Sequence, residues 1–280
     1  MSSKSRLGCS MLLGAACVFA VVGVAGRRAW RARVEPVEDG GVGLLCGKSM
    51  AAPMEELIAA FQRQSNVQVE AMYGASDRMM EQLAATPAAA DLFLPGEPSY
   101  VEQAREAGFV GGAEVVAWLV PAILVRAGNP REIESLADFA RPGLRVAIAA
   151  PASRARGCRV RALGRIMGTL LEKHGLTAGD IEPNVVVRGT TGHELGSAVA
   201  FGHVDAAVLW DVVGRRYPST EIVSIAEDRN LPVPVKVGVL DHARENPAAR
   251  AFLEFLHTET ARGILHAHHY QHPPNVENIP

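Results

Sequence analysis

Four loops of this 280-residue chain carry groups suited to binding an anion. Each follows an apolar, strand-like run and precedes a helix-like stretch. The first N–H groups of a helix have no partner inside the helix, and they lie at the positive end of its dipole. The pattern therefore predicts capture of an anion by converging hydrogen-bond donors, without a metal. The loops are Cys46-Gly47-Lys48-Ser49, Gly74-Ala75-Ser76-Asp77, Ala155-Arg156-Gly157-Cys158 and Gly189-Thr190-Thr191-Gly192.

The hydroxyl residues of these loops have a simpler interpretation as helix caps. A serine or threonine cap stabilises a helix by about 1 kcal/mol. Thr191 and Glu194 have the spacing of a capping box. Taken singly, Ser49, Ser76 and Thr191 are better explained as caps. Their shared position favours a ligand, because doubly wound sheets bind ligands at the carboxyl ends of their strands.

The elements that must position these loops alternate between strand and helix. This repeated βα order predicts a largely parallel sheet with helices on both faces. The apolar run Val115–Arg126 is expected to be one extended strand that crosses between two lobes. The other predicted strands are 42–46, 67–73, 91–94, 144–149, 184–187, 205–210 and 235–240, and the predicted helices are 50–64, 77–83, 98–107, 158–174, 192–201, 246–257 and 258–269.

Composition and charge exclude several classes of protein. Hydrophobic residues make up 48% of the chain and charged residues 21%, enough for one or two buried cores. The net charge is −2, and residues 1–33 hold six basic and no acidic residues, so the remainder carries −8. A body this acidic is a poor nucleic-acid binder. No nucleophile–base pair or metal motif is present, so we expect a binding protein and not an enzyme.

The N-terminus predicts export. Leu7–Gly26 is uncharged and follows two basic residues, as in a signal peptide or an uncleaved membrane anchor. Val24-Ala25-Gly26 is a suitable cleavage site, but the arginines that follow resist translocation. Lipidation at Cys17 is a weaker alternative. We expect residues 1–33 to be the leader or anchor and residues 34–41 a linker.

Two cysteines and a histidine-rich tail remain. Cys46 and Cys158 have no zinc spacing, and we favour two buried thiols over a disulfide. His266, His268, His269 and His272 lack an acidic or cysteine partner beside them, so a frayed helix end explains them better than a metal site.

Five segments, in order and spacing, resemble the substrate-binding proteins of molybdate ABC transporters, a branch of the type II periplasmic binding proteins. The resemblance runs from Val42 to Tyr270. The segments are Gly47-Lys48-Ser49-Met50, Tyr73-Gly74-Ala75-Ser76, Ala88-Ala89-Ala90-Asp91-Leu92-Phe93-Leu94, Phe201-Gly202-His203-Val204-Asp205-Ala206-Ala207-Val208 and Asn246–Leu256.

The resemblance implies a two-lobed α/β fold, each lobe a mostly parallel sheet flanked by helices, with a tetrahedral oxyanion in the cleft. Lobe one would comprise residues 42–120 and 234–272, and lobe two residues 121–233. It further implies molybdate or tungstate as ligand, no cofactor, a monomer in the periplasm, and delivery to an ABC permease. The implied site residues are the hydroxyls of Ser49 and Ser76, backbone donors near Arg156, Gly157 and Gly192, and Trp210 in place of the family's tyrosine.

The sequence departs from the family at two of these positions. An indole N–H at Trp210 donates but does not accept, and it is bulkier than a phenol. A guanidinium at Arg156 can bind an oxyanion with two hydrogen bonds, or it can point to solvent while its backbone N–H binds. Phosphate, sulfate and an organic anion therefore remain alternative ligands. Ferric iron is a further alternative, but it would need tyrosine and histidine ligands, and the four tyrosines do not fall at the loops named above.

Overall fold

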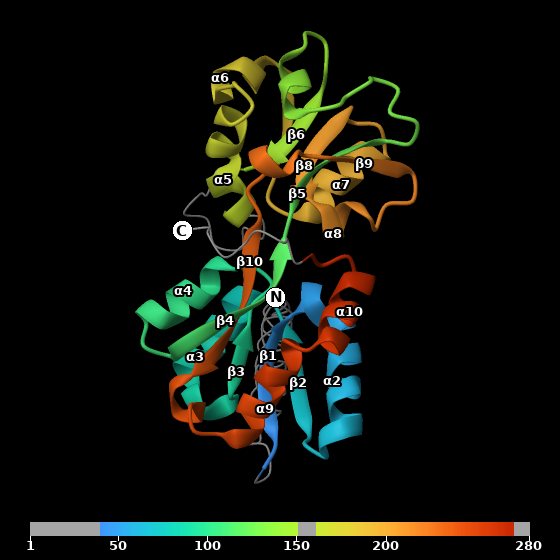
Figure 1. Cartoon of the computed structure of the whole chain (residues 1–280). Coiled ribbons are helices and arrows are strands. Elements are labelled where there is room, and N and C mark those ends of the chain that lie inside the picture. Colours follow the sequence, from blue (N-terminus) through green and yellow to red (C-terminus); the bar gives the residue numbers. More distant parts are fainter. Residues whose placement is uncertain (1–39, 151–160, 272–280) are drawn as a thin grey trace, which may run out of the picture. The chain divides into compact units, whose positions relative to one another are not determined.

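The computed structural model describes residues 40–150 and 161–271 (Figure 1). The expected leader at 1–33, most of the linker, and the predicted residues Arg156, Gly157, Cys158 and His272 lie outside these ranges. Within them, no helix is both long and apolar enough to cross a membrane.

The first of two five-stranded sheets has the order β2-β1-β3-β10-β4. β1 is parallel to β2 and β3, whereas β10 is antiparallel to β3 and β4. All six residues of β1 are buried, as expected of a central strand covered on both faces. The strands are β1 (Val42–Gly47), β2 (Val69–Gly74), β3 (Leu92–Leu94), β4 (Val110–Leu119) and β10 (Val233–Leu240), and the helices of this lobe are α2 (Ala51–Ser65), α3 (Ser76–Ala85), α4 (Ser99–Glu106), α9 (Pro247–Leu256) and α10 (Glu259–Ala267).

The second sheet repeats this plan with the order β7-β6-β8-β5-β9. β6 is parallel to β7 and β8, and β5 is antiparallel to β8 and β9. The strands are β5 (Pro121–Arg126), β6 (Val146–Ala149), β7 (Val185–Gly189), β8 (Ala206–Trp210) and β9 (Thr220–Ser224), and the helices are α5 (Arg161–Glu172), α6 (Ala178–Ile181), α7 (Gly192–Ala200) and α8 (Asp211–Gly214). The prediction of a two-lobed α/β fold is confirmed. Each sheet is mixed: three neighbouring strands pair in parallel, β2-β1-β3 in the first sheet and β7-β6-β8 in the second, and the other pairings are antiparallel.

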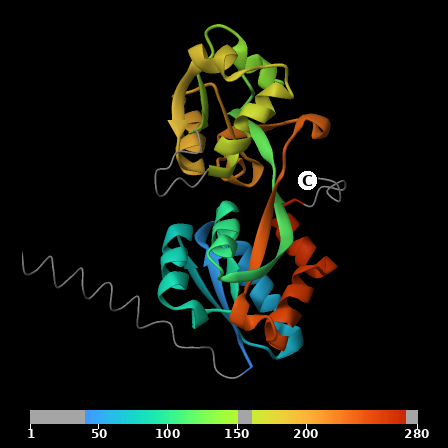
Figure 2. The same cartoon turned by 90° about the vertical axis from the view of Figure 1, so that its left-hand side faces the viewer.

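The chain passes from the first sheet to the second through β4 and β5, which pair antiparallel with their neighbours. β4 belongs to the first sheet and β5, which follows it, to the second (Figures 1 and 2). The predicted single strand Val115–Arg126 is therefore two strands that part at Val120. Pro121 explains the break, because proline has no N–H to donate and restricts the residue before it. We retain 42–120 with 234–272, and 121–233, as the proposed bounds of the lobes.

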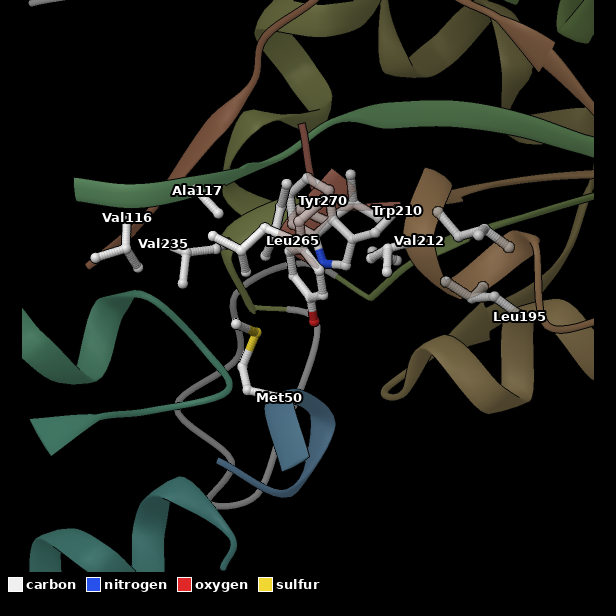
Figure 3. Close-up of a cluster of buried hydrophobic side chains, with 14 of the residues drawn as sticks. Met50, Val116, Ala117, Leu195, Trp210, Val212, Val235, Leu265 and Tyr270 are labelled. Carbon is white, nitrogen blue, oxygen red and sulfur yellow. The ribbon is translucent and has the colours of Figure 1, made fainter. Parts of the chain in front are cut away.

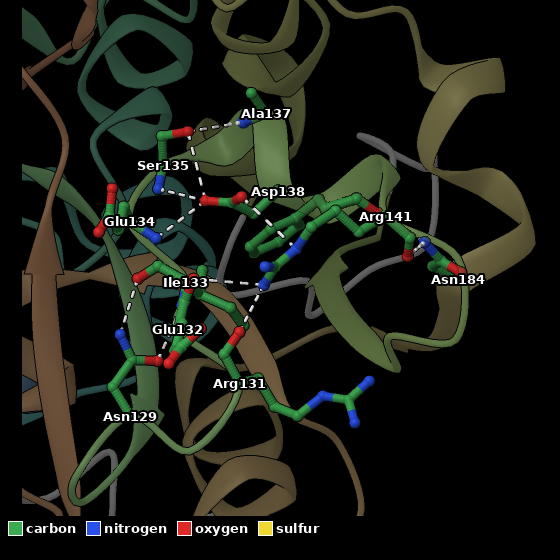
Figure 4. Close-up of polar contacts among 11 residues, drawn as sticks. Asn129, Arg131, Glu132, Ile133, Glu134, Ser135, Ala137, Asp138, Arg141 and Asn184 are labelled. Carbon is green, nitrogen blue, oxygen red and sulfur yellow. Dashed lines mark hydrogen bonds and ion pairs between the residues drawn. The ribbon is translucent and has the colours of Figure 1, made fainter.

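A network of polar contacts shapes the long connection from β5 to β6 (Figure 4). The Asp138 carboxylate accepts hydrogen bonds from the backbone N–H groups of Glu134 and Ser135, at 2.8 and 2.9 Å. The buried side chain of Asn184 donates to the carbonyls of Phe139 and Arg141, both at 2.8 Å. These bonds satisfy backbone groups that no sheet pairs.

Candidate functional site

The carboxyl ends of β1, β2 and β3 meet at one edge of the first sheet. Cys46 pairs with Tyr73 on one side and with Leu94 on the other, so the three strands end at the same level. The loops that carry Ser49 and Ser76 therefore leave the same edge. A third loop, residues 95–98, leaves the same edge and was not predicted as part of the site.

Two of these loops touch through glycines. A Cβ atom added at Gly47 would lie 2.1 Å from the backbone nitrogen of Gly96, and one added at Gly96 would lie 2.5 Å from the Ser49 hydroxyl oxygen. Only glycine fits such close approach. The Ser49 side chain thus lies directly against the loop after β3.

The hydroxyls of Ser49 and Ser76 cap no helix. The N-cap of α2 is Met50 and that of α3 is Ala75, and neither makes a side-chain capping bond. Ser49 is exposed and Ser76 half-buried. Thr191 does act as a cap, since its hydroxyl oxygen accepts from the Glu194 N–H at 3.1 Å. The capping interpretation therefore holds for Thr191 and fails for both serines.

The predicted residues of the second lobe lie at the matching strand ends. Gly192 is the first residue of α7, and a Cβ added there would come within 3.0 Å of the Val213 side chain. Trp210 ends β8 and is only 6% exposed. Its indole belongs to a buried cluster with Val212, Leu265 and Tyr270 (Figure 3). Trp210 thus contributes packing at this position.

Tyr270 and Arg216 meet at the backbone of Ser49, and neither was predicted from the sequence. The Tyr270 hydroxyl and the Arg216 guanidinium each donate to the Ser49 carbonyl oxygen at 3.4 Å. Burial raises the pKa of Tyr270, so its hydroxyl stays protonated. Arg216 is exposed and forms no ion pair with a carboxylate in the described ranges. It supplies positive charge beside the Ser49 loop.

A buried acid, Glu97, lies in the third loop. Its side chain accepts a hydrogen bond from the Ser99 hydroxyl and another, at 3.0 Å, from the backbone N–H of Ala162. Ala162 belongs to α5, in the second lobe. The Pro-Gly-Glu-Pro sequence of residues 95–98, directly after β3, was the one signal that could have indicated it.

Cys46 is a free, buried thiol that donates to its neighbour's carbonyl. Burial raises its pKa, which makes it unreactive. Of the tail histidines, His268 pairs with Glu56 at 2.9 Å. In the part of the chain that the structure describes, no three His, Cys, Asp or Glu side chains gather to hold a metal ion.

Two α/β lobes joined by crossing strands, with donor-rich loops at the strand ends, define a solute-binding protein. The chain belongs to the bacterial extracellular solute-binding proteins, whose family model matches residues 42–271. A protein of Haemophilus influenzae described as a binding protein is 25% identical over 166 residues, which cover 59% of this chain and 64% of that protein. The match thus spans less than two thirds of that relative's length.

Solved structures share the fold at low sequence identity. The substrate-binding domain described for a molybdenum ABC transporter of Clostridium difficile has a TM-score of 0.68 at 17% identity, covering 83% of this chain and 99% of that one. The sulfate-binding protein SubI of Mycobacterium tuberculosis has a TM-score of 0.63 at 20% identity, with 84% and 88% covered. Iron-bound HitA of Pseudomonas aeruginosa has 0.59 at 17% identity, with 80% and 84% covered. These neighbours bind different solutes, so the likeness shows the fold alone.

Proposed function

We propose that the protein captures a tetrahedral oxyanion outside the cytoplasm and delivers it, as a monomer, to an ABC permease. The observation that carries this proposal is the pair of serine hydroxyls, Ser49 and Ser76, at one sheet edge. Neither hydroxyl caps a helix, which supports a role in binding a ligand. Arg216 adds positive charge at the Ser49 loop.

The remaining donors of the proposed site come from the second lobe. They are the backbone N–H groups near Arg156, Gly157 and Gly192 and, in place of the family's tyrosine, the indole N–H of Trp210. A helix N-terminus such as that of α7 presents N–H groups to an anion without further charge. Closure of the two lobes about the crossing strands would then surround the ligand.

Molybdate and tungstate are the ligands that the resemblance implies. Phosphate, sulfate and small organic anions offer the same acceptor oxygens and are the alternatives. Each anion would be held by donors fixed in place. Each donor left without an acceptor lowers the binding free energy by about 1–3 kcal/mol. The proposed role is binding and release, with no chemical step and no cofactor.

Calorimetric titration of the purified chain with molybdate, tungstate, sulfate and phosphate tests this function. We expect at least one of the four to bind, and the double variant Ser49→Ala with Ser76→Ala to lose that binding. Ser135→Ala is the control, because its hydroxyl caps a turn of the β5–β6 connection instead. Binding that survives the double variant unchanged would refute the site.

A further inference from the structure

The segment that follows α10, Tyr270 and Gln271, leaves its helix in a fixed direction. α10 ends in a Schellman motif, in which the N–H of His269 donates to the His266 carbonyl at 2.8 Å and the N–H of Tyr270 donates to the Leu265 carbonyl at 2.9 Å. His269 has the left-handed φ of 64° that this motif requires. The turn directs the two residues toward the end of β4.

Gln271 bonds on both sides of the break between β4 and β5, which we call the hinge. Its carbonyl oxygen accepts from the Trp118 N–H at 2.9 Å, an antiparallel bridge near the end of β4. Its side-chain amide donates to the Asp211 carboxylate at 2.7 Å. The Asp211 N–H donates in turn to the Val120 carbonyl, at 2.9 Å. Gln271 thus joins β4 of the first sheet to α8 of the second lobe.

The groups that hold this segment are buried. Asp211 is 4% exposed, and its carboxylate pairs with the Arg215 guanidinium at 2.7 Å as well as accepting from Gln271. A hydrogen bond to a buried carboxylate is stronger than one between neutral groups, and its loss leaves a charged acceptor short of a donor. Tyr270 packs in the buried cluster of Figure 3 and donates to the Ser49 carbonyl. The segment is therefore anchored at both of its residues.

We propose that Tyr270 and Gln271 form a clasp across the hinge that limits how far the two lobes open. In a hinged solute-binding protein the lobes exchange between open and closed arrangements, and a bond made in only one of them shifts the balance toward it. A rotation that moves α8 away from α10 must break the bond between Gln271 and Asp211. The clasp is made by the chain itself and requires no ligand.

The test uses the full chain without any anion, in the wild type and three variants. Gln271→Glu places a second carboxylate against Asp211, and Gln271→Ala removes the hydrogen bond without adding repulsion. Gln103→Ala is the matched control. Gln103 is half-buried, as Gln271 is, but its side chain donates to the Ser99 carbonyl within α4. Amide hydrogen exchange reports on opening at the hinge, and small-angle X-ray scattering reports on the separation of the lobes.

We expect the backbone amides of Trp118 and Asp211 to exchange at least about tenfold faster in both Gln271 variants than in the wild type. The amides of β1 should exchange as in the wild type, because the core of the first lobe stays closed. Both Gln271 variants should also have a larger radius of gyration. Gln103→Ala should match the wild type in the exchange of Trp118 and Asp211 and in its radius.

Three results would overturn the clasp. They are unchanged exchange at Trp118 and Asp211, an unchanged radius of gyration, and faster exchange that reaches β1 to the same extent, which would mean a general loss of stability. If Gln271→Glu does not fold, the same two measurements on Gln271→Ala decide. Because no anion is present, failure of the proposed oxyanion capture leaves this result intact, and the reverse also holds.

Discussion

At the scale of single residues, hydroxyls of the same type have different structural roles. Thr258 caps α10, its oxygen accepting from the Ala261 N–H at 3.3 Å. Ser49 and Ser76 cap nothing. We predict that Ser49→Ala and Ser76→Ala each change the free energy of unfolding by less than about 0.5 kcal/mol, whereas Thr258→Ala lowers it by about 1 kcal/mol. Urea unfolding measures all three, and a serine variant as destabilised as Thr258→Ala would show a structural role.

His174 should make stability depend on pH. Both ring nitrogens are buried without a hydrogen-bond partner in the described ranges. Burial first, and then Arg229, lowers the pKa of His174 below its ordinary 6.5. Below about pH 6.5 the unfolded chain therefore binds more protons than the folded one, and the free energy of unfolding falls as the pH drops.

The variant His174→Leu tests this dependence. It removes the titrating ring and keeps an apolar side chain of similar size at a half-buried position. We expect urea unfolding of the variant to lose less stability between pH 7 and pH 5 than the wild type does. Equal losses of stability in the wild type and the variant would show that His174 does not contribute to the pH dependence.

At the scale of elements, the contact between Gly47 and Gly96 fixes how two strand-end loops pack. A Cβ at position 47 would meet backbone, which cannot move aside as a side chain can. We predict that Gly47→Ala lowers the free energy of unfolding by about 1–3 kcal/mol. Gly168→Ala is the matched control: nothing lies within 4 Å of its added Cβ in α5, so the variant should be about 0.5–1 kcal/mol more stable. Similar effects of the two substitutions on thermal unfolding would contradict the close packing.

The sequence predicted those elements whose pattern is local. The buried run of β1 and the apolar face of α2 appear close to their predicted places, since periodicity and flanking residues specify them. β9 was missed, because Thr220–Ser224 is short, has no fully buried residue and is held by its pairing with β5. The break at Val120 was also missed, because it depends on β4 and β5 belonging to different sheets.

The candidate site was predicted only where a loop carried its own signal. Ser49 and Ser76 follow closely after apolar, strand-like runs, so the sequence alone predicted that they lie at strand ends. Glu97, Arg216 and Tyr270 could not be found in this way. Tyr270 reaches the Ser49 carbonyl across 221 residues and Glu97 reaches Ala162 across 65, so only the folded chain brings these groups together.

At the scale of the whole molecule, one buried cluster includes residues of both sheets. Tyr270 is 3% exposed in it, together with Trp210 and Met50 (Figure 3). We predict that Tyr270→Ala lowers the free energy of unfolding by about 3–5 kcal/mol, because it leaves a large cavity. Tyr270→Phe should cost only about 0.5–1.5 kcal/mol, since it removes one hydrogen bond. Urea unfolding distinguishes them, and equal losses would mean that the hydroxyl and not the packing matters.

The central claim, capture of an oxyanion between the lobes, is tested most directly by titrating the purified chain with phosphate, arsenate, sulfate, molybdate and tungstate while following thermal unfolding. A ligand at a thousand times its dissociation constant should stabilise the fold by about 4 kcal/mol. We predict such a shift for at least one of these anions and its loss in Ser49→Ala with Ser76→Ala. No shift with any of them, or a shift that the double variant retains, would contradict it.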